Sequence, residues 1–268
     1  MRKRRRVLPK ILIALILVGA LIYAAVSWFF SEQLIAQKFK ALRPVDVTSY
    51  GLPPPESDRI RGDGVDLASW YFVNPRKEGC AVVMLHGFSG SRQELLGATP
   101  LYWNLGCDLL MYDARGHGDS SPSLLTYGAH EKDDLARAVD WLATKTSLPH
   151  KKIGLAGWSY GAATALQAAA DIPDLGLVVA DSSYSSLGDI ARAQGRSQFG
   201  DWTKYFVPGA LLVSVSVPVS TLVASHPTRR FVTSTNRRCW SIPVRTSSPP
   251  SNSPRRSTPT ATTTTPNW

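Results

Sequence analysis

The residues with the clearest chemical potential form the motif GWSYG at residues 157–161. An apolar run precedes the motif and an Ala-rich stretch begins near Ala162, so its serine is expected at a sharp turn between a strand and a helix. Such a turn strains the backbone and lifts the hydroxyl clear of the sheet, and the two glycines avoid collisions with the neighbouring strand and helix. Ser159 is therefore the predicted nucleophile, with a carbonyl carbon as its target.

A second motif, HGFSG at residues 86–90, directly follows another apolar run. Serine attack on a carbonyl group places negative charge on the carbonyl oxygen, which two preorganised N–H donors must stabilise. We assign these donors to the backbone N–H groups of Phe88 and Tyr160. Each such donor typically lowers the barrier by about 3 kcal/mol, so both are needed for useful rates.

The third motif, DARGHG at residues 113–118, ends a further apolar run and contains two glycines suited to a tight turn. We expect Asp113 and Arg115 to hold this loop through charge-assisted hydrogen bonds. His117 lies before Ser159 in the chain, and we interpret it as a structural residue rather than a catalytic base.

Hydrophobic patterns in the sequence predict the strands and helices that position these motifs. Apolar runs at residues 80–85, 107–112, 153–156 and 175–180 are continuous, as in strands buried on both faces. Helical patterns at residues 133–143 and 161–170 alternate with them, and a hairpin around residues 62–64 opens the domain. The pattern predicts an α/β fold with a mostly parallel sheet and helices on both faces.

The order of these motifs and strands, together with DSSYSS at residues 181–186, resembles the α/β-hydrolase superfamily over residues 58–190. The similarity is greatest to membrane-anchored or exported serine hydrolases of the serine aminopeptidase and esterase/lipase branches. This resemblance implies an eight-stranded, mostly parallel sheet, a nucleophile at Ser159 and hydrolysis of an ester, thioester or amide in a small-molecule or peptide substrate.

The N-terminus indicates a membrane location. Residues 11–30 form an uncharged run of 20 that reaches about 30 Å as a helix, enough to cross the hydrocarbon core. Six basic residues in residues 1–10 favour a cytoplasmic N-terminus. We therefore expect a single transmembrane helix in the cell membrane, then a Pro-containing linker at residues 31–57, and then an extracytoplasmic domain. The alternatives are a signal peptide cleaved near residues 25–27 and a buried helix of a soluble domain.

Charge and cysteine patterns argue against other functions. The net charge of +10 comes from the two ends, because residues 11–225 carry a net charge of −3, so no nucleic-acid partner is expected. No GxxxxGK[ST] or GxGxxG loop is present, and the three cysteines lack metal-ligand spacing, so neither a cofactor nor a metal is expected. We interpret Cys80 and Cys107 as small buried residues at strand starts rather than as a disulfide.

The C-terminal part departs from the family pattern, which places the catalytic acid and histidine after the serine. No Asp or Glu follows Asp201, and Ser, Thr, Pro and Arg occupy 31 of the 43 positions in residues 226–268. We therefore predict a hydrolase core at residues 58–213 that lacks its last strands, and an anomalous, disordered tail at residues 214–268. A change of reading frame near residues 214–225 is our preferred account, and a Ser/Thr/Pro-rich stalk is the alternative.

This loss limits the predicted mechanism. His226 is the only histidine after Ser159, and Asp181 is the best remaining acid, although in similar hydrolases it begins a structural loop. We expect a membrane-anchored serine hydrolase whose activity is weakened or abolished, or alternatively a non-catalytic binding module that uses a cleft near Trp158 and Tyr160. Residues 188–205 are a candidate lid, and His130 and His150 are interpreted as a helix-start residue and a surface-loop residue.

Overall fold

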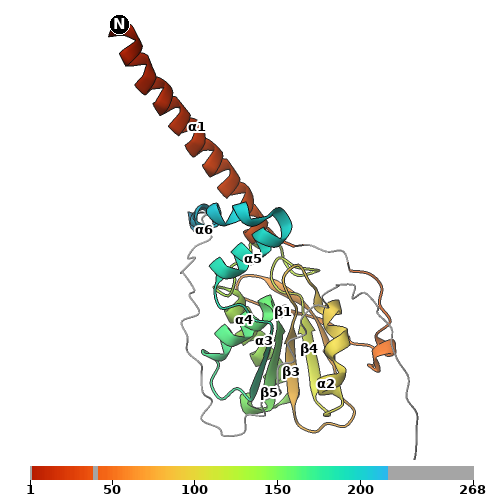
Figure 1. Cartoon of the computed structure of the whole chain (residues 1–268). Helices are drawn as coiled ribbons and strands as arrows, with labels where there is room; N and C mark the ends of the chain where they lie inside the picture. The colour runs from red at the N-terminus through yellow and green to blue at the C-terminus, as the bar shows by residue number, and fades with distance from the viewer. Residues whose placement is uncertain (1, 39–41, 217–268) are drawn as a thin grey trace, which may run out of the picture. The chain divides into compact units, whose positions relative to one another are not determined.

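The computed structural model describes residues 2–38 and 42–216, all within one compact unit (Figure 1). A sheet with the order β1-β2-β4-β3-β5-β6 lies at its centre. The strands β3 to β6 run parallel, and β2 and β1 continue the sheet antiparallel. The strands are β1 (Glu56–Arg61), β2 (Asp66–Phe72), β3 (Ala81–Leu85), β4 (Asp108–Tyr112), β5 (Ile153–Trp158) and β6 (Leu177–Asp181).

Alternate residues of the central strands enter two separate cores, which is why their sequences are continuously apolar. Val83 of β3 faces the core under the helices α3 (Glu131–Thr146) and α4 (Tyr160–Ala169). Its neighbours Val82 and Met84 face the opposite core, which is covered by η1 (Val47–Tyr50), η2 (Arg92–Ala98) and α2 (Pro100–Trp103). The predicted α/β architecture is confirmed, and so is the predicted hairpin, which joins β1 and β2.

The strand β6 has one partner, β5, among the residues that the structure describes. Its side chains are exposed or half-buried, and Leu177 is 56 % exposed. The described ranges therefore contain six of the eight strands that the family resemblance implies. The tail from residue 217 onward, with Cys239 and His226, lies outside them.

The N-terminal helix α1 (Arg2–Ile35) is longer than the predicted segment at residues 11–30. Within it, residues Pro9–Ile35 are long and apolar enough to cross a membrane, and the most apolar window is only 6 % buried. Within the described residues this window is therefore not buried, and the choice between a membrane anchor and the alternatives stays a prediction. The chain leaves the helix after Ile35, a few residues into the segment that the sequence assigned to the linker.

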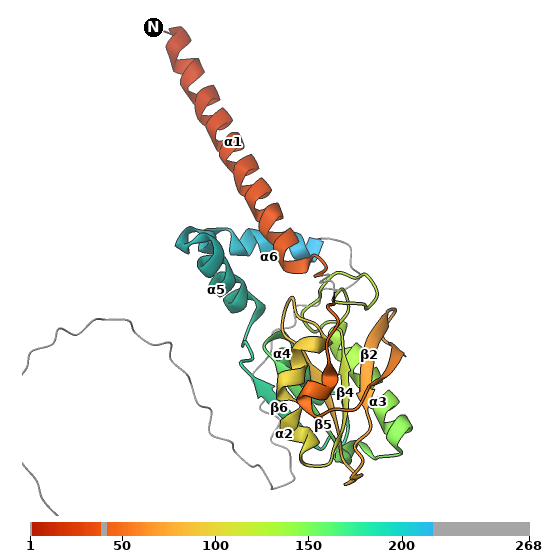
Figure 2. The same cartoon turned by 90° about the vertical axis from the view of Figure 1, so that its right-hand side faces the viewer.

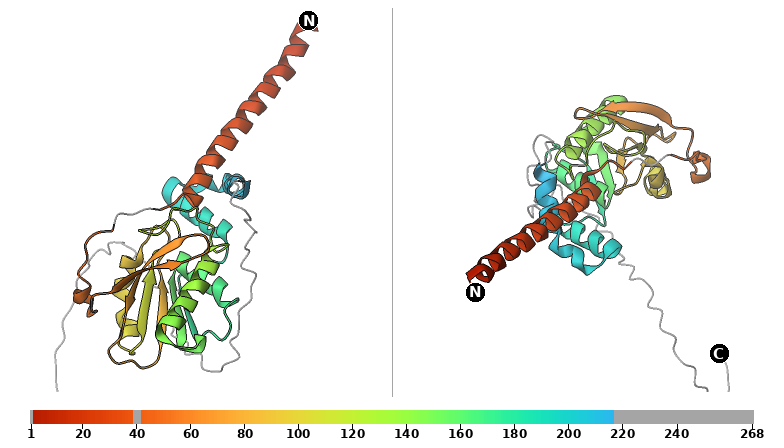
Figure 3. Two further views of the ribbon diagram at one scale, coloured as in Figure 1. Left: turned by 180° about the vertical axis from the view of Figure 1, so that it is seen from behind. Right: turned by 90° about the horizontal axis from the view of Figure 1, so that it is seen from above.

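Three helical segments after β6 lie against α1 rather than on the sheet (Figures 1 and 2). They are α5 (Leu187–Phe199), η4 (Asp201–Tyr205) and α6 (Val207–Ser216). The helix α6 makes the most extensive contact with α1 and continues past residue 213, where the predicted core ends. Figure 3 shows these helices grouped at the base of α1 from two further sides.

Cys80 and Cys107 lie at strand starts, as predicted, but a disulfide joins them, so the interpretation as small buried residues alone is wrong. The two cysteines are 27 residues apart in the chain, but each immediately precedes one of two adjacent parallel strands. The register Ala81 to Asp108 therefore brings their Cα atoms to 4.6 Å. Strand register, which sequence spacing does not reveal, determines this bond.

Candidate active site

Ser159 occupies a strained turn between β5 and α4. Its φ and ψ angles are 49° and −106°, in a region that residues with a side chain rarely adopt and that typically costs about 1–3 kcal/mol. The backbone is fixed on both sides, because Ser159 N–H donates to the Asp181 carbonyl at 2.8 Å and Ala163 N–H donates to the Ser159 carbonyl at 3.0 Å. This is the geometry that the GWSYG motif predicts, and the side chain is half-buried.

The two glycines of the motif are required by close packing. A Cβ atom on Gly157 would lie 2.3 Å from the Gly161 carbonyl oxygen, and one on Gly161 would lie 2.6 Å from the carbonyl oxygens of Leu85 and His86. The start of α4 is thus pressed against the end of β3. This packing places the loop at residues 86–90 beside the serine, since a Cβ on Gly87 would lie 3.8 Å from the Ser159 Cβ.

Two neutral imidazoles hold that loop. His86 Nδ1 donates to the Gly87 carbonyl at 2.7 Å, and its Nε2 accepts from Ala114 N–H at 3.0 Å. His117 Nδ1 donates to the Arg115 carbonyl at 3.0 Å, and its Nε2 accepts from Ser89 N–H at 3.3 Å. Burial lowers the pKa of each histidine to about 4, which keeps both acceptors available at neutral pH. His117 therefore has the structural role that the sequence predicted.

The two predicted oxyanion donors belong to the two segments that meet at the serine, the loop at residues 86–90 and the start of α4. Tyr160 is the first residue of α4, where backbone N–H groups have no partner within the helix. Phe88 lies in a turn closed by a hydrogen bond from Gly90 N–H to the Gly87 carbonyl at 3.0 Å. The assignment of these two N–H groups to an oxyanion hole remains a prediction.

The loop at residues 113–118 is held by buried ion pairs, as predicted. The Asp113 carboxylate accepts from the Arg92 N–H at 2.7 Å and pairs with the Arg92 guanidinium. Arg115 donates to both carboxylate oxygens of Asp134 at 2.7 and 2.8 Å. Burial raises the pKa of Asp113 and of Asp134 in spite of these partners. Arg92 and Asp134 were not expected from the sequence, because neither belongs to a recognisable motif.

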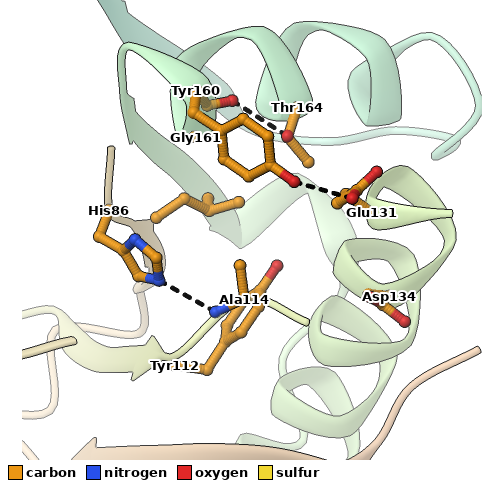
Figure 4. Close-up of a pocket in the computed structure, with 9 residues that line it drawn as sticks. His86, Tyr112, Ala114, Glu131, Asp134, Tyr160, Gly161 and Thr164 are labelled. Carbon is orange, nitrogen blue, oxygen red and sulfur yellow. Dashed lines mark hydrogen bonds between the residues drawn. The ribbon is translucent and has the colours of Figure 1, made fainter. Parts of the chain in front are cut away.

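The side chain of Tyr160 belongs to the core, where it lines a small pocket among buried residues rather than a cleft shared with Trp158. Its hydroxyl donates to the Glu131 carboxylate at 2.7 Å, and the residue is 2 % exposed (Figure 4). The same carboxylate accepts from the N–H groups of Thr126 and Gly128 at 2.7 and 2.6 Å. Glu131 thus positions the first turn of α4, a role that no sequence motif indicates, while Trp158 points outward and is 49 % exposed.

The histidines and the candidate acid have other partners in the described part of the chain. His130 lies at the start of α3, as predicted, and pairs with Asp63 at 2.8 Å, and His150 pairs with Asp140 at 3.0 Å. Asp181 ends β6 beside the turn, as expected, but its carboxylate accepts from the Ser182 hydroxyl at 2.8 Å. The roles suggested for Asp181 and His226 therefore stay predictions.

A cavity of about 180 Å³ lies next to the loop at residues 86–90. Its walls come from the end of α1, from α5, η4 and α6, and from that loop. The lining combines apolar side chains with the amide groups of glutamines and the ammonium group of Lys38. The cavity is lined by Phe30, Gln33, Leu34, Lys38, Phe88, Ser89, Ala191, Gln194, Gly195, Gln198, Phe199, Thr203, Val207 and Ala210.

The predicted lid segment forms part of this cavity wall. Phe199 and Trp202 pack on Phe30 of α1, with ring centroids 5.4 and 5.8 Å apart. Lys38 Nζ lies 5.2 Å from the centre of the Phe88 ring, and burial lowers the pKa of this lysine. The cavity is therefore enclosed by the segment that leads out of the N-terminal helix as well as by the hydrolase core.

One group of residues has the ligand types of a metal site. Asp63, His130 and Asp133 each offer one ligand atom, and these atoms lie within 4.8 Å of one another at the start of α3. Asp63 is already paired with His130 and lies 3.6 Å from the Arg137 guanidinium. We interpret the group as an ion-pair network that ties the β1–β2 turn to α3.

Comparison with known proteins identifies the family. The family model described as alpha/beta hydrolase fold matches residues 81–266, more than half of the chain. The chain belongs to the α/β-hydrolase family. The matched range extends into the Ser/Thr/Pro/Arg-rich tail, where the sequence contains no Asp or Glu.

The individual proteins described next have sequence identities to this chain of 35 % or less. The uncharacterized protein YqkD of Bacillus subtilis is 33 % identical over 129 residues, which are 48 % of this chain and 39 % of YqkD. The thiohydrolase apmlB of Arthrinium phaeospermum is 35 % identical over 121 residues, or 44 % of this chain and 39 % of that protein. The Pyrococcus furiosus esterase PF2001 has a TM-score of 0.54 at 25 % identity, over 69 % of this chain and 70 % of the esterase. The chain spans 39 % to 65 % of the length of the curated relatives that it matches.

Proposed function

We propose that this hydrolase is a membrane-anchored serine hydrolase that acts on an ester, thioester or amide through Ser159. The observation that carries the proposal is the left-handed backbone of Ser159 at the junction of β5 and α4, beside the loop at residues 86–90. Backbone strain of this kind persists where the surrounding structure enforces it and is common at catalytic centres.

In the proposed reaction, the Ser159 oxygen forms a bond to the carbonyl carbon, and the carbonyl oxygen receives the negative charge. The N–H groups of Phe88 and Tyr160 would stabilise this oxygen. Expulsion of the leaving alcohol, thiol or amine leaves an acyl group on Ser159, which water then removes. The serine must transfer its proton to a general base, because the hydroxyl is a weak nucleophile at neutral pH.

The second candidate function is a non-catalytic binding module on the same scaffold. The observation that favours it is that four histidines already bind other groups, so none of them is free to act as the base. These are His86, His117, His130 and His150. Serine hydrolases that lack their triad partners still hydrolyse substrates about 10³–10⁴ times faster than water does. The rate of hydrolysis therefore distinguishes the two candidate functions.

The names of two similar proteins favour an acyl substrate. One relative is a thiohydrolase and another is an esterase by name, and both fit the cleavage of a thioester or an ester. The cavity beside Phe88 and Ser89 is the best candidate for the acyl or peptide part of the substrate, because it is next to the proposed oxyanion donor.

The location is proposed from two observations. The apolar helix α1 is long enough to anchor the chain in the cell membrane, with the basic residues 1–10 in the cytoplasm. The disulfide between Cys80 and Cys107 fits an extracytoplasmic domain, because disulfides persist in oxidising compartments.

A fluorophosphonate probe tests the nucleophile. We expect covalent labelling of the full chain that disappears in Ser159→Ala and persists in Ser182→Ala, a control one residue beyond the end of the adjacent strand β6. Labelling that survives Ser159→Ala would refute the proposed nucleophile. No labelling of the wild-type chain would favour the binding module.

Fractionation and thiol counting test the location. The full chain should stay with membranes after an alkaline carbonate wash, and its release would contradict the anchor. Chain isolated from these membranes and denatured without reductant should react with maleimide at Cys239 alone, and at all three cysteines after reduction. Three reactive thiols before reduction would contradict an oxidising location.

A further inference from the structure

Small and polar residues form one part of the contact between α6 and α1, beside a buried apolar cluster that includes Leu34, Ile35 and Val207. Gly209 of α6 packs on Ser27 so closely that a Cβ atom there would lie 2.3 Å from the serine oxygen. One turn further along, the hydroxyls of Ser31 and Ser214 form a buried hydrogen bond of 2.9 Å. Ser27 and Ser31 are each 1 % exposed, which places both inside the contact.

Some large apolar residues of the same two helices are exposed. Leu212 of α6 is 69 % exposed, and Trp28 and Phe29 of α1 are 56 % and 48 % exposed. In lipid, the surrounding chains are as apolar as leucine, so helices can leave such residues exposed and associate through small residues and hydroxyl hydrogen bonds. The buried pair Ser31–Ser214 and the close approach of Gly209 to Ser27 fit this kind of packing.

The position of the contact along α1 agrees with this packing. The residues of α1 that touch α6 and η4, from Tyr23 to Ser31, lie inside the candidate membrane span Pro9–Ile35. Tyr23 donates to the Tyr205 carbonyl at 3.2 Å and stacks on Phe206, with ring centroids 5.2 Å apart. A membrane that contains this part of α1 therefore reaches α6 as well.

The segment before α6 carries the residues typical of a membrane–water interface. Trp202 and Tyr205 of η4 are 49 % and 67 % exposed, and tryptophan and tyrosine concentrate at the level of the lipid headgroups. The helix α6 itself contains no charged residue, and it crosses the base of α1 rather than extending the sheet (Figures 1 and 2).

We propose that η4 and α6 form a second membrane-contacting element, in which α6 lies in the outer part of the bilayer that holds α1. The inference rests on the proposed anchoring by α1. The occupant of the exposed apolar face of α6 is the lipid itself, because this face is continuous with the exposed apolar surface of α1. The cavity beside Phe88 is then walled by two lipid-contacting helices, so its natural ligand is an amphiphile that arrives from the membrane.

Spin labels on the full chain in phosphatidylcholine vesicles test this proposal. Single cysteines are introduced by Leu212→Cys, Leu21→Cys and Leu105→Cys in a Cys239→Ser background, with the Cys80–Cys107 disulfide intact. The three leucines are 69 %, 71 % and 65 % exposed, so labelling disturbs little packing. Relaxation by oxygen reports lipid, and relaxation by a water-soluble nickel complex reports water.

We expect the label at position 212 to match the label at position 21, with strong relaxation by oxygen and loss of relaxation by nickel, while position 105 shows the reverse. A label at position 212 that behaves like position 105 would overturn the proposal and leave the anchor intact. Water exposure at both 21 and 212 would instead show that the anchoring by α1 has failed. A second label, introduced by Tyr205→Cys, should give relaxation between those of 21 and 105, and full nickel access there would also count against the proposal.

Discussion

The helix pairs α3–α4 and α1–α6 are built from the same backbone geometry but differ in what they bury. Leu135, Ala138 and Leu142 of α3 are fully buried against the sheet, and of its charged residues Glu131 and Asp134 are buried. In the other pair Ser27 and Ser31 are buried, whereas Leu212, Trp28 and Phe29 are exposed. The proposed contact of α6 with lipid explains why these apolar residues stay exposed.

His86 and His117, which hold the loop at residues 86–90, should give the largest effect, because two buried groups act together. Burial lowers the folded pKa of His86 and His117 from 6.5 to about 4, so unfolding takes up protons between these values. Stability should therefore be fully present above pH 6.5 and be lost as pH falls toward about 4. For each histidine, a tenfold difference in proton affinity between the folded and unfolded chain corresponds to about 1.4 kcal/mol. Denaturant unfolding of the full chain in detergent at a series of pH values measures this loss.

The charged groups near these histidines set the size of the acid effect. His86 faces Arg92 and Glu94, and His117 faces Asp113 and Glu131. The raised pKa of Asp113 acts in the opposite direction, because it favours the folded state at low pH. His117→Gln should flatten the pH profile, and His150→Gln, a surface control, should not. An unchanged profile in His117→Gln would contradict the assignment.

The buried ion pair of α3 should give the next largest effect. Asp134→Ala removes the partner of the buried Arg115 guanidinium, which should destabilise the core by about 3–5 kcal/mol. Asp189→Ala breaks an exposed pair with Arg192 on α5 and should cost less than about 1 kcal/mol. Denaturant midpoints of the two variants compare them, and equal midpoints would show that burial is not the cause.

A pair of leucines tests the two kinds of packing directly. Leu135→Ala empties a fully buried site on α3 and should cost about 2–5 kcal/mol. Leu212→Ala removes an exposed side chain of α6 and should change the unfolding free energy by no more than about 0.5 kcal/mol. A loss at Leu212 as large as that at Leu135 would mean that α6 has a protein-covered apolar face.

Two glycines offer a matched test of the α1–α6 contact. Gly209→Leu forces a side chain against Ser27 and should destabilise this contact by about 1–3 kcal/mol. Gly19→Leu adds the same side chain to α1 where no atom lies within 4 Å, and it should have no such effect. Accessibility of a spin label at position 212 reports whether α6 has left α1. Equal accessibility of the label in the two variants would show that α6 does not pack on Ser27.

The smallest expected effect comes from the hydroxyl pair. Ser31→Ala removes one partner of the buried hydrogen bond to Ser214, and such bonds between helices in membranes average about 0.6 kcal/mol. A double-mutant cycle with Ser214→Ala, in which α6 dissociation is followed by the same label, should give a coupling of this size. Additive single effects would indicate that the bond contributes nothing.

The hydrolase core was predictable because its signals are local. The four central strands, the helices α3 and α4 and the turn at Ser159 were each expected within a few residues of their observed bounds. Continuous apolar runs, helical periodicity and paired glycines report the environment of the residues that carry them. The role of Asp113 and Arg115 followed in the same way from a short loop sequence.

The partners across the fold were not predictable, because each depends on residues that are distant in the chain. Glu131 under Tyr160 and Arg92 beside Asp113 carry no motif, and only the packing of α3 and η2 reveals them. The placement of α6 on α1 joins residues more than 180 positions apart. A local pattern contains no information about such contacts.

The α/β class, the strained position of Ser159 and an apolar N-terminal helix follow from the order of residues alone, since hydrophobic period and glycine placement are properties of chain neighbours. The bond between Cys80 and Cys107, the burial of Tyr160 and the packing of α6 on α1 through serines and glycine emerge only in the folded molecule. Strand register and helix packing bring these groups together, and both are settled by the whole chain in its surrounding solvent.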